Sequence, residues 1–264
     1  MERSRRRFLK ILGISTLGVG TISSVDLLAM VGKGDEPTYT RAPDALIGKR
    51  WAFVVDVNKL DEETTQKAID ACNRTHNIPH LENKEEEIKW IWTDKYGHAF
   101  PGQEYDYMTE EIEGKPFLLL CNHCSNPPCV RVCPTQATWQ RADGIVMMDQ
   151  HRCIGCRYCM AGCPFGARSF NWQDAKVTYW QEHEPPNPTY PVRGKGVVEK
   201  CNLCAERLAE GKIPACVEAV EDSKAIVFGD LEDPNSEVRE LLREHFAIRR
   251  KPELGTSPNV YYIV

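Results

Sequence analysis

The sequence of 264 residues lacks several features that mark common classes of protein. After the first 31 residues no apolar run approaches the roughly eighteen residues of a membrane-spanning helix, and the C-terminal NVYYIV is too short to cross a bilayer. Lys and Arg form no run outside the first ten residues and the formal net charge is -5, so we expect no nucleic-acid partner. No P-loop, G-x-G-x-x-G segment or Ser-His-Asp arrangement is evident. We therefore expect a soluble or peripheral chain with no substrate-converting site of its own.

The N-terminus has the composition of an export signal. A basic head, Ser4–Lys10, precedes fifteen uncharged and mostly apolar or small residues, Ile11–Val25. The string SRRRFLK resembles the twin-arginine signal S-R-R-x-F-L-K. Ala29 lacks a small residue two positions earlier, so the segment is either cleaved or retained as an anchor. We predict a signal segment over 1–31, a linker over 32–48, and a location in the periplasm or on the extracytoplasmic face of the membrane.

Cysteine is abundant and unevenly distributed. Eleven of the twelve cysteines fall between positions 121 and 216, and Cys72 stands alone. An exported chain with an even number of cysteines could hold six disulfides, but Cys-x2-Cys neighbours close very small loops and contribute little cross-linking. Zinc ribbons also use Cys-x2-Cys pairs, but they do not need a Cys-Pro element that occurs twice. Both alternatives stay open beside the iron-sulfur interpretation that follows.

Two cysteine runs follow the spacing of bacterial ferredoxins. The run CIGCRYCMAGCP (153–164) reads Cys-x2-Cys-x2-Cys-x3-Cys-Pro, in which three thiolates bind one [4Fe-4S] cluster and the fourth binds the other cluster. The run CNHCSNPPCVRVCP (121–134) repeats this pattern with a middle gap that is two residues longer. We predict crossed ligation, with Cys121, Cys124, Cys129 and Cys163 on cluster B and Cys133, Cys153, Cys156 and Cys159 on cluster C.

The last cysteine run supplies only three thiols. It reads Cys201-x2-Cys204-x11-Cys216, and Val220 stands where the fourth cysteine of the pattern belongs. The missing ligand must come from one lone cysteine in an upstream helical turn, and Cys72 in AIDACN meets that description. We therefore predict three [4Fe-4S] clusters, the third being cluster A with ligands Cys72, Cys201, Cys204 and Cys216.

A fourth cluster is predicted to be absent. If Cys72 ended a complete run, the other cysteines of that run would stand near Glu62, Thr65 and Ala68, or at Leu60 if the spacing has drifted. None of these residues is cysteine. The lost cluster would have taken three ligands from that run and one from position 220, and all four are missing together.

The pattern of strands, turns and repeats predicts the fold. Two segments, beginning at Cys129 and Cys159, each read Cys-x3-Cys-Pro, strand, polar turn, strand, and a third and weaker copy begins at Cys216. Residues 51–58 favour a strand, and the following LDEETTQKAIDACNR and the later SEVRELLREHF favour helices, the second with Ser236 as its N-cap. Residues 77–115 are polar and broken by prolines and glycines, which is typical of a long surface insertion.

We therefore predict an α+β fold made of tandem bacterial-ferredoxin-like, βαβ-type modules around [4Fe-4S] clusters, with long loop insertions. The iron-sulfur domain would span 49–264. It would consist of a central module at 121–175, a second module made of 49–76 and 197–264, and the insertion at 77–115. His123, His151 and His183 lie near the cysteine runs, and we interpret them as ordinary loop residues.

The chain resembles the four-cluster ferredoxin-like iron-sulfur subunits of membrane-associated redox complexes, such as those of dimethyl sulfoxide, polysulfide and tetrathionate reductases. The resemblance runs from about Lys49 to the C-terminus. It rests on KRWAFVVDVNK, CNHCSNPPCVRVCPTQAT, CIGCRYCMAGCPFGAR, EKCNLCAERLAEGKIPACVEA, FGDLEDPNSEVRELL and KPELGTSPNVYYIV. It implies one-electron relay rather than substrate chemistry.

The chain departs from this family by the loss of one cluster. In the family, the corresponding cluster resembles the entry point that faces a molybdopterin catalytic subunit. An export signal with three clusters is more similar to the periplasmic DsrO type of subunit in DsrMKJOP (Hme) complexes. That resemblance implies an NrfD-like integral membrane quinone-interacting subunit and a multihaem cytochrome c as partners. The alternative is the electron-transfer subunit of a molybdopterin oxidoreductase.

Overall fold

The structure is a computed structural model that describes residues 42–103, 107, 109–175 and 187–264. The predicted signal segment, most of the predicted linker and His183 lie outside the described residues. Residues 42–264 belong to one unit of the chain. Within the described part of the chain, no helix is both long and apolar enough to cross a membrane.

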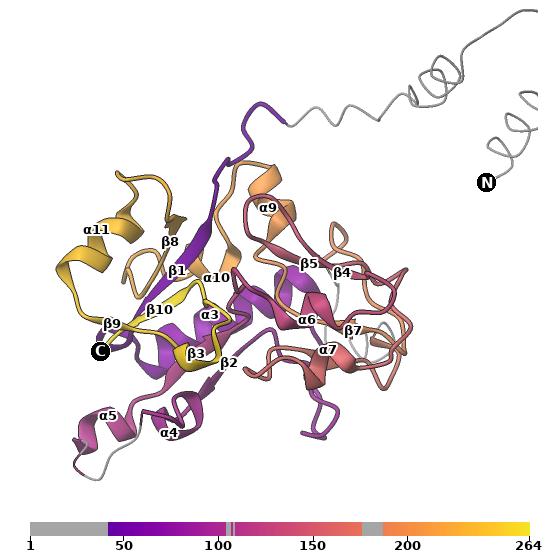
Figure 1. Ribbon diagram of the computed structural model, residues 1–264, viewed down its shortest axis with the longest axis horizontal. Coiled ribbons are helices and arrows are strands. Elements are labelled where there is room, and N and C mark those ends of the chain that lie inside the picture. The colour runs from indigo at the N-terminus through magenta and orange to yellow at the C-terminus, as the bar shows by residue number, and fades with distance from the viewer. Residues whose placement is uncertain (1–41, 104–106, 108, 176–186) are drawn as a thin grey trace, which may run out of the picture. The chain divides into compact units, whose positions relative to one another are not determined.

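The largest sheet has four strands in the order β8-β1-β10-β9 (Figure 1). Its members are β1 (Trp51–Asp56), β8 (Ile226–Asp230), β9 (Ala247–Ile248) and β10 (Val260–Ile263). Strand β1 pairs in parallel with β10 and antiparallel with β8, and β9 pairs antiparallel with β10. The sheet therefore joins the first described strand to the C-terminal part of the chain.

Strand β1 is buried on both faces. Phe53 and Val55 point into the main core, whereas Ala52 and Val54 pack in a second apolar cluster with residues of helix α11 (Glu237–Glu244). Successive side chains of a strand point to opposite faces, so an uninterrupted apolar run is what a two-sided strand needs. The run WAFVVD therefore forms the predicted strand and continues into a short 3-10 helix, η1 (Val57–Lys59).

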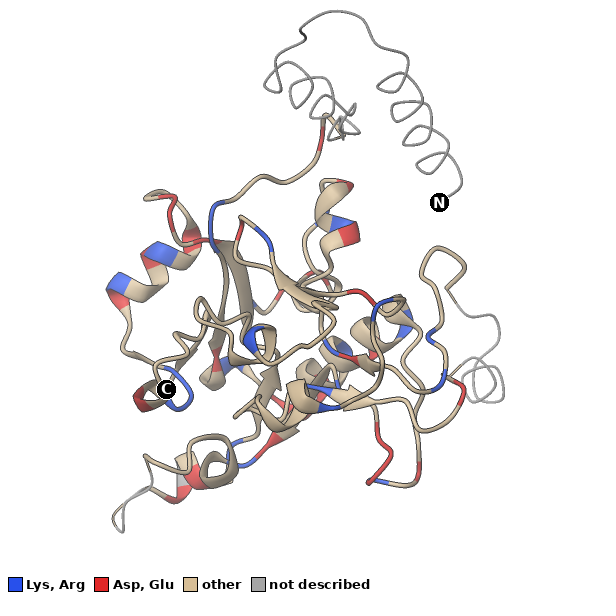
Figure 2. Cartoon of the chain, turned by 45° about the vertical axis from the view of Figure 1, so that its right-hand side comes forward, with Lys and Arg blue, Asp and Glu red and all other residues tan. Residues whose placement is uncertain are grey.

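Helix α11 confirms the late helix expected from the sequence. Acids stand in its first turn and Arg243 in its last, as the helix dipole favours. Figure 2 shows charges of both signs along its ribbon, while Val238 is buried against the sheet. Ser236 occupies the N-cap position, but its side chain makes no capping hydrogen bond.

Helix α3 (Glu62–His76) follows β1 and packs against the short helix α10 (Ala215–Glu218). The Asp61 side chain accepts a hydrogen bond of 2.7 Å from the Thr64 backbone N–H, which satisfies one free donor of the first turn. At the other end, Asn77 ends the helix in the left-handed conformation, with φ of 52°. The helix predicted from LDEETTQKAIDACNR is confirmed.

The central part of the chain consists of short elements between cysteine loops. Two short helices pack against each other, α6 (Pro128–Arg131) and α7 (Tyr158–Ala161). The hairpin of β4 (Thr138–Gln140) and β5 (Val146–Met148) follows α6, and this confirms the strand-turn-strand pattern predicted for the first repeat copy. After α7, β6 (Ser169–Phe170) pairs with the distant β7 (Val198–Glu199). The last strand of the second copy lies outside the described residues.

Residues 77–115 are not a surface insertion, so this prediction was wrong. The segment contains β2 (Ile91–Asp94), which pairs with β3 (Phe117–Leu120), and the short helices α4 (Tyr96–Ala99) and α5 (Glu110–Gly114). Phe100 is fully buried and its ring meets those of Tyr96, Phe117 and Tyr262. The prolines and glycines limit the length of the elements, but the aromatic residues between them anchor the segment in the core.

Candidate metal centres

All twelve cysteines lie in the described residues, and all carry free thiols. Eight are buried, three are half-buried and Cys156 is exposed. The fold therefore does not form the six disulfides that the sequence left open as an alternative. The thiols are considered in the three groups of four that the sequence predicts, named A, B and C after the predicted clusters.

Group A consists of Cys72, Cys201, Cys204 and Cys216. Cys72 points from α3, Cys216 belongs to α10, and the other two lie in the loop before α9 (Ala205–Ala209). The Cys72 thiol is close enough to the other three for each of them to raise its pKa. The structure thus places the lone upstream cysteine with the three-thiol run.

Backbone amides also point at the group A sulfurs. The N–H of Leu203 donates to Cys201 Sγ at 3.4 Å, and that of Ala215 donates to Cys204 Sγ at 3.5 Å. Leu203 and Cys204 both have positive φ, 61° and 49°, because the loop turns tightly around the thiols. Amide hydrogen bonds of this kind tune iron-sulfur clusters.

The thiols of group A sit in a desolvated environment. Burial raises the pKa of Cys201 and Cys216 to about 12, and it also raises those of Cys72 and Cys204 well above the ordinary range. Four converging thiols that cannot easily ionise alone are the donor set that a cationic metal centre needs, since the metal displaces the protons. The residues present therefore fit a [4Fe-4S] cluster.

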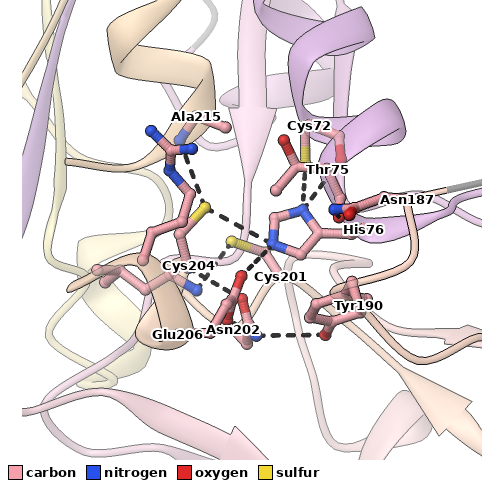
Figure 3. A network of polar contacts seen from close by, with 12 residues as sticks. Cys72, Thr75, His76, Asn187, Tyr190, Cys201, Asn202, Cys204, Glu206 and Ala215 are labelled. Carbon is pink, nitrogen blue, oxygen red and sulfur yellow. Dashed lines mark hydrogen bonds and ion pairs between the residues drawn. The ribbon is translucent and has the colours of Figure 1, made fainter. Parts of the chain in front are cut away.

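His76, which the cysteine spacing alone does not reveal, lies against group A (Figure 3). Its Nδ1 is 3.0 Å from the carbonyl oxygen of Cys72 and 3.7 Å from the Cys72 sulfur, and its Nε2 is 3.6 Å from the Cys204 sulfur. Nε2 also donates to Glu206 Oε1 at 2.8 Å. Burial acts to raise the pKa of Glu206, but hydrogen bonds from His76 and Asn202 hold it below its ordinary value.

His76, Cys204 and Glu206 could also hold a metal ion of their own, because one donor atom of each lies within 4.8 Å of the others. Cys204 belongs to group A as well, so the two arrangements compete for one thiol. Four soft thiolates suit an iron-sulfur cluster, whereas this trio offers one sulfur, one imidazole and one carboxylate. The four-thiol arrangement also accounts for Cys72, and we prefer it.

A buried ion pair supports the wall beside His76. Arg193 Nη2 lies 2.6 Å from Glu199 Oε2, both side chains are almost fully buried, and Trp90 Nε1 donates to the same carboxylate oxygen at 2.8 Å. Arg193 also donates to the carbonyl oxygen of His76. The Trp90 ring packs on the His76 ring at a centroid distance of 4.5 Å. The position of His76 is thereby fixed from two sides.

Group B consists of Cys121, Cys124, Cys129 and Cys163. All four line one small cavity of about 20 Å³, together with Asn122, Arg168 and several apolar residues. Burial raises the pKa of Cys124 to about 12, and the thiols of Cys121, Cys163 and Cys129 add to the effect. The crossed arrangement predicted from the ferredoxin spacing is thus the one in which these side chains meet, and their four thiols are the donor set that a [4Fe-4S] cluster takes.

Group C consists of Cys133, Cys153, Cys156 and Cys159. Cys153 and Cys159 share one buried cluster of side chains with Cys129. Cys133 follows α6, which packs against the helix α7 that carries Cys159. Cys156 is exposed. Group C therefore reaches the surface at Cys156, whereas Cys159 is buried.

Backbone geometry fits the group C loop to a metal centre. The N–H groups of Gly155 and Val198 donate to Cys153 Sγ at 3.4 and 3.5 Å. Gly155 has φ of 70°, and an added Cβ would collide with the carbonyl oxygen of Gly196. Burial acts to raise the pKa of Cys133, but hydrogen bonds from Thr138, Thr135 and the nearby backbone lower it.

The three groups follow one another in the order A, B, C. Cys121 of group B is close enough to raise the pKa of Cys201 in group A. Cys129 of group B does the same to Cys159 of group C. Group B is therefore the neighbour of both other groups.

The positions of the predicted lost cluster hold no thiol. Ala68 and Val220 are buried in the main apolar core, Leu60 lies in the same core, and Thr65 is buried nearby. Glu62 is exposed in the first turn of α3. Close packing of small and branched side chains fills the space beside Cys72 and Cys216.

Two buried cations and one buried histidine near the thiols were not predicted from the sequence. Lys200 donates to the carbonyl oxygens of Val146 and Cys201, and Arg168 lines the group B cavity.

The interpretation of His123 as an ordinary loop residue was wrong. His123 is buried, and its Nδ1 accepts a hydrogen bond from the Val146 N–H at 3.0 Å. Burial, with the charges of Lys200 and Arg168, lowers its pKa. The only sign of Lys200, Arg168 and His123 in the sequence is that each is a charged or titratable residue close to a cysteine run. His151 is an exposed residue of a turn, which agrees with its interpretation as an ordinary loop residue.

The segment of residues 116–181 matches the model of the 4Fe-4S dicluster domain. This match covers every cysteine of groups B and C. It leaves out all four of group A, so the third cluster rests on the spacing and on the geometry described above.

Several characterised proteins are similar to the chain over nearly their whole length. The Hdr-like menaquinol oxidoreductase iron-sulfur subunit 1 of Archaeoglobus fulgidus is 37% identical, over 98% of this chain and 97% of that protein. A selenate reductase subunit of Mesobacillus selenatarsenatis is 42% identical over 98% and 97%. A tetrathionate reductase subunit of Salmonella typhimurium is 33% identical over 100% and 89%. The chain therefore belongs to the family of ferredoxin-like 4Fe-4S iron-sulfur subunits of redox complexes.

Proposed function

We propose that the chain relays single electrons through three [4Fe-4S] clusters in a membrane-associated, quinone-linked complex of sulfur metabolism, as a subunit of the DsrO type. The observation that carries the proposal is the convergence of four thiols in each of groups A and B, with Cys153 and Cys159 of group C beside Cys129 of group B. A row of adjoining thiol groups is suited to the conduction of electrons from one group to the next.

The ligands would be Cys72, Cys201, Cys204 and Cys216 for cluster A, Cys121, Cys124, Cys129 and Cys163 for cluster B, and Cys133, Cys153, Cys156 and Cys159 for cluster C. When bound, each cluster would take up and release one electron. The chain's own residues supply the amide donors to sulfur, the buried cations and the apolar walls that exclude water. These features set the relative stability of the oxidised and reduced forms.

The surface at group C offers one end of the relay to a partner. Cys156 is exposed, and so are Ile154 and Tyr158 on either side of it. Exposed apolar residues around a conducting centre suit a docking surface, whereas the thiols of group A are all buried. In this proposal electrons pass between group C and another member of the complex.

The proposed partners are an NrfD-like membrane subunit that exchanges electrons with quinone and a multihaem cytochrome c. The similarity to an iron-sulfur subunit of a menaquinol oxidoreductase, over nearly the whole of both chains, supports the quinone-linked assignment. Export by the twin-arginine route is part of the same proposal, on the strength of Ser4–Lys10. Cluster A would be the end of the relay opposite cluster C, because core side chains occupy the positions that would hold a fourth cluster beyond it.

The alternative is the electron-transfer subunit of a molybdopterin oxidoreductase. The similarity to subunits of tetrathionate reductase and selenate reductase favours it. The missing fourth cluster counts against it, because the family resemblance assigns that cluster to the face of the catalytic subunit.

Purification of the complex from the native membrane through a C-terminal tag, under anaerobic conditions, separates the two functions. The first predicts co-purification of a polytopic membrane protein and a haem protein, and reduction of the clusters by a menaquinol analogue. A co-purifying molybdopterin subunit, with clusters that menaquinol reduces only through that subunit, would replace the proposed function by the alternative.

A further inference from the structure

Arg168 lies between groups B and C and is 5% exposed. It follows the loop CPFGA and stands directly before β6. Its Nη1 donates to Thr138 Oγ1 at 3.2 Å and to Met148 Sδ at 3.7 Å, which ties it to the hairpin of β4 and β5. Among the described residues its Nη2 has no hydrogen-bond partner, although it is buried.

The guanidinium of Arg168 faces thiols of both groups. It lines the cavity that contains the four thiols of group B, and it interacts with Cys129 of group B and Cys159 of group C.

Arg168 also lacks the usual partner of a buried arginine. In the described part of the chain, no carboxylate forms an ion pair with it, whereas Arg193 is paired with Glu199. A buried charge without a counter-ion is costly. Groups B and C lie next to Arg168, and each would carry a net negative charge once iron is bound. They can therefore serve as the counter-ions of this buried cation.

We propose that Arg168 is an electrostatic bridge that favours the reduced forms of clusters B and C together and so raises the reduction potentials of both. The inference rests on the proposed function, since it requires both clusters. A fixed positive charge in a poorly solvated site stabilises whichever form carries the extra negative charge, and the reduced cluster is that form. Arg168 acts here as a positioning residue, not as a ligand.

The test is a potentiometric titration of the purified holoprotein, followed by electron paramagnetic resonance, for three variants. Arg168→Met removes the charge, Arg168→Lys keeps it, and Arg157→Gln is the control. Arg157 stands in the group C loop and carries the same charge, but it is exposed and packs on Phe170 and Trp172. Iron content is measured on every sample.

In Arg168→Met we expect two of the three one-electron reduction equilibria to shift toward the oxidised form by at least about tenfold, which is about 59 mV for a one-electron couple. Arg168→Lys should restore most of the shift, and Arg157→Gln should move the potentials much less. Full iron with wild-type potentials in Arg168→Met would overturn the inference, as would an equal shift in Arg157→Gln.

The lysine variant decides the matter even if Arg168→Met loses its iron. A role through charge predicts full iron and near wild-type potentials in Arg168→Lys. A purely structural role would act through the hydrogen bonds from Arg168 to Thr138 and Met148. It predicts that Arg168→Lys loses its iron like Arg168→Met, and this result would overturn the inference. Failure of the proposed function is distinguishable, because it would show as wild-type protein without iron.

Discussion

Groups A and C have the same number of thiols and the same Cys-x2-Cys turn, but they differ in burial. The group A thiols lie inside the core between α3 and α10, and each is less than about a tenth exposed (4–8%). Group C comes from helix α7 with its loop and from Cys133 after α6; Cys156 is exposed, and Cys133 and Cys153 are half-buried. The difference shows that the packing around a cysteine motif, not its spacing, decides whether the site is sealed from solvent or open to a partner.

The largest effect is expected from removing one equivalent thiol from each group. Cys204 and Cys156 are both the second cysteine of a Cys-x2-Cys pair. Cys204→Ala and Cys156→Ala should each lower the iron content by about four atoms per chain. Cys204→Ala should also lower the thermal unfolding midpoint by several degrees more, because an empty site in the core leaves a cavity. Equal midpoints for the two variants would break the comparison.

Loss of iron to a chelator should follow the same difference. Anaerobic incubation of oxidised protein with a strong iron chelator should first release about four iron atoms, those of the exposed group C. The remaining iron should leave several times more slowly. Iron release is followed by absorbance, and Cys156→Ala serves as the matched control that lacks the fast phase. A single phase for all the iron would show that burial does not protect group A.

The pH dependence of cluster assembly should differ between the groups. Burial raises the pKa of Cys201 and Cys216 in group A to about 12. In group C burial raises the pKa of Cys159, but hydrogen bonds lower that of Cys133. Thiolates bind the metal, so the reactive fraction at group A rises about tenfold per pH unit between 7 and 9. We expect reconstitution of Cys156→Ala, which keeps group A, to rise more steeply with pH than that of Cys204→Ala, which keeps group C. Parallel pH profiles would contradict the assigned environments.

The raised pKa values also affect the fold of the iron-free protein. A group whose pKa is higher in the folded than in the unfolded state stabilises the fold fully below the unfolded value and loses that contribution as the pH rises through the folded value. The buried thiols of group A should therefore weaken the iron-free fold as the pH rises from about 9 toward about 12. Thermal unfolding across this range measures the effect.

The smallest effect is expected in the core that replaces the fourth cluster. Val220→Ala removes two methyl groups from a side chain that is 3% exposed, which should lower the free energy of unfolding by about 2 kcal/mol. The iron content should stay unchanged, because position 220 is packing and not ligation. Val132→Ala, at a valine that is 38% exposed, should change stability by no more than about 0.5 kcal/mol. Loss of iron in Val220→Ala would contradict this role.

The sequence led to a definite prediction for the metal groups, whereas its prediction for part of the chain between them was wrong. Ligand spacing is local chemistry, and the absence of a cysteine at position 220 was enough to point to Cys72. The segment of residues 77–115 was misjudged, because its polar composition hid Trp90 and Phe100, whose packing depends on contacts far along the chain. His76 and Arg168 were missed for the same reason, since each acquires its role only when distant segments meet.

The most direct test of the account is the quantity of iron and acid-labile sulfide per chain in anaerobically purified protein, with Cys72→Ala measured beside it. The account predicts about twelve of each in the wild type and about eight in Cys72→Ala. About eight in both proteins would make Cys72 an ordinary buried thiol and would contradict the three-cluster arrangement.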